Sequence, residues 1–119
     1  QQIPKRRKLM FDVSTAISAV TLEEAKQHLR VDHDADDEFI KRLILSCTQL
    51  CEQEILHGII DREGTSGFSK DVDHVPEAIK TWILIRVAER YETREGVSAG
   101  ELKPIPWVEA LLDPYRWRQ

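Results

Sequence analysis

The sequence predicts an all-α fold, a small bundle of three to four helices. Three observations predict it: long segments with apolar residues at helical spacing, capping or proline signals where they begin, and glycines where they end. The chain has 119 residues, of which 41% are hydrophobic and 32% charged, enough for one domain with a buried core. We expect an N-terminal arm over residues 1–19, a helical domain over 20–116 and a C-terminal tail over 117–119.

The first helix is predicted from Leu22 to about Arg30. Thr21 and Glu24 have the spacing of a capping box, in which each side chain accepts a hydrogen bond from the other residue's backbone N–H. In the arm before it, serines and threonines interrupt the apolar residues, so we expect this segment to stay extended or loosely ordered until it meets a partner.

The second helix is predicted from about Asp36 to Leu56, after a turn rich in carboxylates in which Asp34 or Asp36 is a suitable N-cap. Its apolar residues recur at steps of three and four, which predicts one buried stripe: Ile40, Leu43, Ile44, Cys47, Leu50, Cys51 and Ile55. The other face is predicted to meet solvent through Glu38, Lys41, Arg42, Gln49, Glu52 and Gln53. Gly58 is a plausible stop. We expect residues 59–74 to form a short hairpin or an ordered loop.

The third helix is predicted from Pro76 to about Arg94, before Gly96. Six apolar residues near its middle surround the helix: Trp82, Ile83, Leu84, Ile85, Val87 and Ala88. A helix that is apolar all round must be covered on all sides, so we expect a second copy of the chain to supply part of the cover. A last short helix is predicted from Trp107 to Leu112, ending before Pro114.

These patterns suggest two sets of binding residues. The candidate subunit interface comprises Trp82, Ile83, Ile85, Arg86, Asp34 and Asp37. Arg86 either extends along apolar surface to water or pairs with an acidic residue of a neighbouring subunit, and both readings stay open. Aromatic residues near the C-terminus are common interface anchors, and the candidates for docking a partner are Trp107, Tyr115 and Trp117.

The charge distribution disfavours tight binding to nucleic acid. The chain has 17 basic and 21 acidic residues, a net charge of −4. Four of the basic residues lie together at positions 5–8, and without them 13 basic residues face 21 acidic ones, which leaves −8. An acidic body repels a phosphate backbone, and the basic run is best read as a solvated terminus. No apolar run is long enough to span a membrane.

No constellation for catalysis, metal or cofactor stands out. Asp32, Asp34 and Asp36 resemble half a calcium loop, but the sixth position is Asp37 and not glycine, and the twelfth is Leu43 and not glutamate. Two further residues, Cys47 and Cys51, lie on the apolar stripe and lack further zinc ligands at suitable spacing. We therefore expect a protein that is not an enzyme and needs no cofactor.

Three pieces of the chain carry a resemblance to a known family. They are VTLEEAKQHLRVD with the acidic run DADDEFI, then PEAIKTWILIRVAERYETREGV, then PWVEALLDPYR. In order and spacing they resemble the small head–tail connector, or adaptor, proteins of tailed bacteriophages, over residues 20–116. The arm over residues 1–19 is longer than the start usual in that family.

The resemblance implies a helical structural subunit without catalytic residues. It implies a closed ring of about a dozen copies below the portal. The portal protein and a downstream connector or tail protein are then the partners, and DNA passes through the channel without sequence-specific binding. The implied location is the head–tail junction of the virion, with assembly in the host cytoplasm. An acidic body fits such a channel, since a basic one would hold the phosphate backbone.

The alternative is a small helical DNA-binding module of the helix-turn-helix type, formed around Val31–Asp37. A recognition helix needs basic residues directed at a groove of the DNA. The first turn of the second helix carries Asp36, Asp37 and Glu38 instead, which disfavours this alternative.

Overall fold

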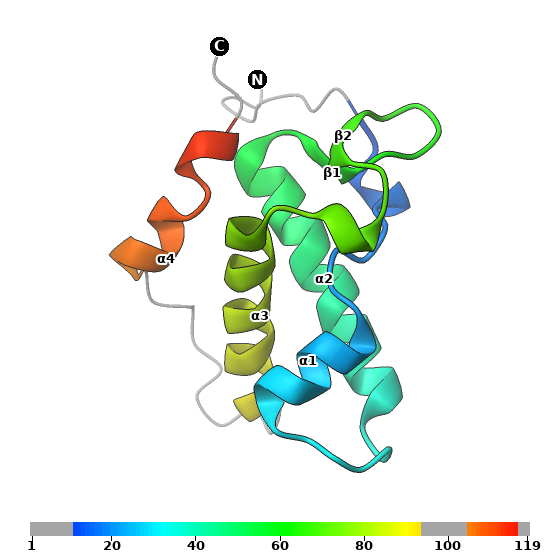
Figure 1. The fold of residues 1–119 in the computed structure, drawn as a ribbon, viewed down its shortest axis with the longest axis vertical. Coiled ribbons are helices and arrows are strands. Elements are labelled where there is room, and N and C mark those ends of the chain that lie inside the picture. The colour runs from blue at the N-terminus through cyan, green and yellow to red at the C-terminus, as the bar shows by residue number, and fades with distance from the viewer. Residues whose placement is uncertain (1–10, 94–104, 117–119) are drawn as a thin grey trace, which may run out of the picture.

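Two antiparallel helices form the centre of the molecule. The structure is a computed structural model that describes residues 11–93 and 105–116. Helix α2 (Asp37–Ile55) lies beside α3 (Glu77–Glu92), α1 (Leu22–Leu29) crosses them near one end, and the short α4 (Pro106–Ala110) lies on the other side of α3 (Figure 1). The described chain is thus mostly helical, as predicted, with a small sheet in addition.

Helix α1 begins with the predicted capping box. The backbone N–H of Glu24 donates to Thr21 Oγ1 at 3.1 Å, and the Thr21 N–H donates to Glu24 Oε1 at 2.9 Å. The helix ends at Arg30, whose φ of 62° lies in the left-handed region that closes many helices.

Helix α2 buries the predicted stripe. Five of its apolar residues are at most 2% exposed, and these are Ile40, Ile44, Cys47, Cys51 and Ile55. The side chain of Asp36, at the N-cap position, makes no capping hydrogen bond and instead accepts one from the Tyr91 hydroxyl at 2.6 Å. Burial raises the pKa of the Cys47 and Cys51 thiols, so both cysteines serve as packing residues.

The segment between α2 and α3 is not an antiparallel hairpin. Strands β1 (Gly58–Ile60) and β2 (Gly67–Ser69) pair in parallel, and antiparallel pairing is confined to the turn between Arg62 and Thr65. The chain turns there and turns again before β2. Gly67 allows the close approach of the strands, because an added Cβ would lie 2.5 Å from the carbonyl carbon of Ile59.

Helix α3 is covered mainly on one side by its own chain. Ile79, Trp82, Ile83 and Val87 are buried, in line with the close packing of α2 against this helix. By contrast, Leu84, Ile85 and Ala88 are half-buried. The sequence predicted that α3 needs cover on all sides. In the structure, of the six apolar residues near its middle, only these half-buried ones still lack full cover. From the C-terminal segment, Val108 and Leu112 are fully buried and complete the core.

Candidate assembly surfaces

A buried ion pair that the sequence did not reveal joins α2 to the turn after β1. Glu52 was expected to face solvent but is 0% exposed. Arg62 binds its carboxylate with both terminal nitrogens, Nη1 at 2.7 Å and Nη2 at 2.9 Å, and the Ile59 N–H donates to Oε2 at 2.9 Å. The two-point geometry and the extra donor offset the free-energy cost of removing the Glu52 carboxylate from water.

The same guanidinium holds the described part of the arm. Arg62 Nε donates to Thr15 Oγ1 at 3.0 Å, and Nη2 donates to the Asp12 carbonyl at 3.2 Å. Nearer α1, the Ala19 N–H donates to Thr48 Oγ1 of α2 at 3.2 Å. Residues 12–19 are thus fixed on the body of the subunit, although the sequence suggested a loosely ordered segment.

A second ion pair joins α1 to α3. Lys80, only 7% exposed, donates through Nζ to Glu24 Oε2 at 2.9 Å. Glu24 is also the capping residue of α1, so one carboxylate serves both the helix start and the contact with α3. Partial burial raises the pKa of Glu24, but hydrogen bonds from Thr21 and Lys80 outweigh it and leave that pKa below its ordinary value.

Arg86 is buried and paired within its own chain, which neither sequence reading anticipated. Its exposed fraction is 3%, and its guanidinium lies 5.2 Å from the centre of the Trp82 ring. Its Nη1 donates to Glu89 Oε1 at 2.9 Å, and its Nη2 binds Glu109 of α4. Burial lowers the pKa of Arg86, but these carboxylates outweigh it and raise that pKa. The pair fastens α4 to α3.

The candidate interface residues form two separate groups. Asp34 and Asp37 bind Lys26 of α1 at 3.1 Å and 2.7 Å, so they fix the turn between α1 and α2. The Asp34 side chain remains 91% exposed. On α3, Trp82 and Ile83 are core residues at 2% and 0% exposure, whereas Ile85 is half-buried.

The aromatic docking candidates differ in their surroundings. Tyr115 makes an edge contact with Phe68 at 5.4 Å between ring centres, and Phe68 stacks on His57 at 4.2 Å. Next to it, Arg116 donates to the carbonyl of Glu54, near the end of α2, at 3.1 Å. By contrast, Trp107 is 62% exposed, while Trp117 lies outside the described residues.

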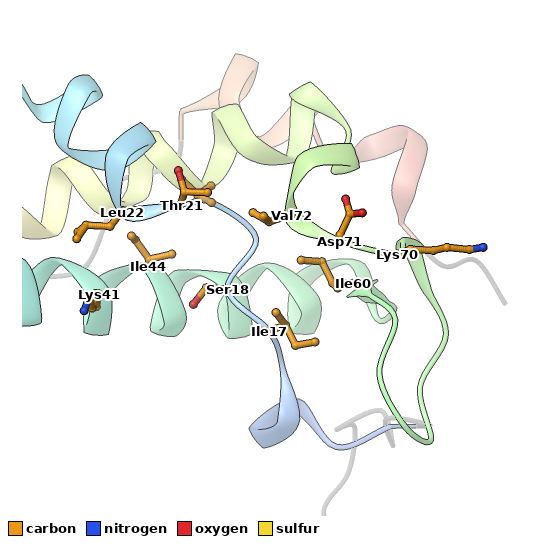
Figure 2. A pocket seen from close by; sticks show the side chains of 11 residues that line it. Ile17, Ser18, Thr21, Leu22, Lys41, Ile44, Ile60, Lys70, Asp71 and Val72 are labelled. Atoms are coloured by element: carbon orange, nitrogen blue, oxygen red, sulfur yellow. The ribbon is translucent and has the colours of Figure 1, made fainter.

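An apolar groove lies between the segment before α1, helix α2 and the strand region (Figure 2). Its volume is about 460 Å³, and its apolar lining residues are Ile17, Val20, Leu22, Ile44, Ile60 and Val72. Lys41 lies at one end and Lys70 at the other (Figure 2). Sequence patterns do not reveal the groove, because its lining comes from four segments that only the fold brings together.

Other kinds of site find no support in the described part of the chain. Across residues 11–93 and 105–116, no three His, Cys, Asp or Glu side chains gather in a way that could hold a metal ion. Among the helices described there, none is both long and apolar enough to cross a membrane.

Comparison with known protein families finds a match over most of the chain. Residues 19–117 match the family described as phage gp6-like head-tail connector protein. No curated protein and no solved structure gives a match. The matched range contains α1 to α4, both strands and the ion pairs Glu52–Arg62, Glu24–Lys80 and Arg86–Glu109. The family is one of structural phage proteins, which agrees with the resemblance seen in the sequence, and the chain belongs to the phage gp6-like head-tail connector proteins.

Proposed function

We propose that this protein forms a closed ring between the portal and the tail of a phage particle. The observation that carries the proposal is the family match over residues 19–117. About a dozen copies repeating one head-to-tail contact close such a ring when the rotation between neighbours allows it. The subunit would act at the head–tail junction of the virion, after assembly in the host cytoplasm.

The subunit contact is proposed on the outer side of α3 and the turn before α2. Ile85 is half-buried in the single chain, and the Asp34 side chain is 91% exposed, so both are available to a neighbour. Beneath this surface, Trp82, Ile83 and Arg86 hold α3 in place, and Asp37 holds the turn through Lys26. These four would support the contact from within the subunit.

The surface for the next virion component is proposed around Tyr115. Phe68, its neighbour, is 40% exposed, and the two rings lie beside the end of α2. Partly exposed aromatic residues on a fixed segment are suited to anchor a partner. We assign this surface to the portal or to a downstream connector or tail protein, with Trp117 as a further candidate.

The channel is proposed to pass DNA without reading its sequence. The first turn of α2 carries Asp37 and Glu38, and Asp37 already neutralises Lys26 of α1. A helix whose first turn is acidic is poorly suited to enter a DNA groove. This argues against the helix-turn-helix alternative and is consistent with a lumen that repels the phosphate backbone.

The test of ring formation is light scattering coupled to size exclusion over a concentration series, with negative-stain images of any large species. Annular particles of about a dozen subunits would support the proposal. In a parallel assay, the protein is added to portal-bearing heads. A strict dimer at all concentrations that also fails to bind these heads would contradict the proposal. Selective binding of one DNA sequence by the protein at low salt would instead favour the DNA-binding module.

A further inference from the structure

The groove beside Ile17 has no role in the contacts proposed above. Its floor is apolar, with Val20, Ile44 and Ile60 at 1–2% exposure, while Ile17 at its edge is 43% exposed. Its volume of about 460 Å³ falls in the size range of clefts that enclose a large side chain or small ligand. Because the groove is lined mainly by apolar side chains, an apolar group is the occupant that it suits.

Trp107 is a projecting side chain that could fill such a groove. It is 62% exposed, more than any other large hydrophobic residue in the described part of the chain. Its helix is firmly mounted, because Val108 is fully buried and Glu109 is bound to Arg86. A fully buried aromatic side chain covers about 150–250 Å² in total, and Trp107 at 62% exposure still has more than half of its surface to bury. It would lose little side-chain freedom, since its helix is already fixed.

The two features lie on different sides of the subunit. In Figure 1, α4 flanks α3 on one side, whereas the segment that precedes α1 and borders the groove lies across α2 on the other. A projection and a groove placed in this way cannot meet within one subunit, but they can meet between successive copies. Repetition of such a head-to-tail contact gives a ring or a filament.

We propose that Trp107 of one copy inserts into the groove of the next, a contact that this chain makes on its own and that rests on the proposed ring. The charges agree with this pairing. Lys41, which is bound to Glu38 at 3.2 Å, and Lys70 lie at the two ends of the groove. On the inserting side, Asp113 follows α4 and stays 63% exposed although it is bound to Arg116 at 3.1 Å. Asp71, which also lines the groove, is paired with His74 at 2.6 Å.

Disulfide trapping between two single-cysteine additions tests the contact. Ala110→Cys is exposed and lies one turn after Trp107, and Ser18→Cys lines the groove. Mixed under mild oxidation, the two variants should form a disulfide between them, while neither forms one alone. The native Cys47 and Cys51 are 0% exposed and should not react. Gln53→Cys, exposed on α2 outside the groove, replaces Ser18→Cys in the control mixture.

Adding Trp107→Ala to the Ala110→Cys variant should weaken the contact about 30-fold or more, or about 2 kcal/mol, and abolish the mixed disulfide at low concentration. Each mixture is also followed by light scattering. Rings without the mixed disulfide would overturn the Trp107 contact and leave the ring standing. A disulfide of Ala110→Cys with itself, or neither disulfide nor oligomer at any concentration, would equally overturn the contact.

Discussion

At the residue scale, buried charged side chains help to hold this small subunit together. Arg62 uses Nε, Nη1 and Nη2 to bind Glu52, Thr15 and two backbone carbonyls. Since the Glu52 and Arg62 side chains are 0% and 7% exposed, solvent screens their attraction little. Removing one member would leave the other charge buried without its partner.

Arg62→Leu should lower the free energy of unfolding by about 3–5 kcal/mol, because the Glu52 carboxylate would stay buried with the Ile59 N–H as its remaining donor among the described contacts. Urea unfolding followed by circular dichroism measures the change. The matched control is Arg42→Leu on the exposed face of α2, with an expected change within about 0.5 kcal/mol. The double variant Glu52→Gln, Arg62→Leu should recover part of the loss, and no recovery would mean that the buried charge is not the cause.

The sequence could predict residues whose partners lie close along the chain, and it failed where partners are distant. The capping box joins Thr21 and Glu24, which are three positions apart, and its prediction is confirmed. Glu52 was predicted to face solvent, because its position in the helix fits the exposed face. Its partner Arg62 lies ten residues later, after β1, and could not be identified from the sequence. For Arg86, the sequence suggested contact with water or with a neighbouring subunit, because its actual partner Glu109 lies 23 residues away on another helix.

At the element scale, α1 is held at its start by one carboxylate with two functions. Glu24 caps the helix and binds Lys80 of α3, so losing it affects both the helix and its packing. The strand pair shows the limits of sequence reading for elements. Residues 59–74 were expected to form a short hairpin or an ordered loop, whereas β1 and β2 pair in parallel.

Thr21→Ala should destabilise the protein by about 0.5–2 kcal/mol, because the Glu24 N–H loses its side-chain acceptor at the helix start. Thermal or urea unfolding measures this, and Thr21→Ser, which keeps the hydroxyl, is the matched control. An unchanged stability of the alanine variant would show that the cap contributes nothing.

The free energy of unfolding should fall on acidification, and part of this fall should come from protonation of Glu24. Its folded-state pKa lies below its ordinary value, so its contribution is present above the unfolded pKa and is lost as pH falls through the folded pKa. Urea unfolding between neutral pH and pH of about 3 measures the loss. Glu24→Gln should show a shallower acid dependence, and an identical slope in both proteins would contradict the assignment.

At the scale of the whole molecule, the helical class and the family were predictable, and the surfaces were not. The helical periods and caps are properties of single segments, which is why α1, α2 and α3 fall close to their predicted bounds. Sequence could not separate Ile85, which is half-buried, from Ile83, which is fully buried, since that depends on which neighbours cover α3.

Ile85→Glu should impair ring assembly while leaving the subunit folded, because the side chain is only half-buried in the single chain and a carboxylate there opposes an apolar contact. Size exclusion with light scattering measures assembly, and circular dichroism checks the fold. Gln53→Glu adds the same charge on the exposed face of α2 as a control. Normal assembly of the Ile85 variant would remove this part of α3 from the subunit contact.

The hydrogen bonds from Arg62 to the arm also set an order of events during synthesis. Asp12 leaves the ribosome 50 residues before the arginine that holds it. At about 5–20 residues per second, the arm waits about 3–10 s for Arg62 to be made. The arm therefore reaches its final position only after the chain has been made as far as Arg62, well after the arm itself was synthesised.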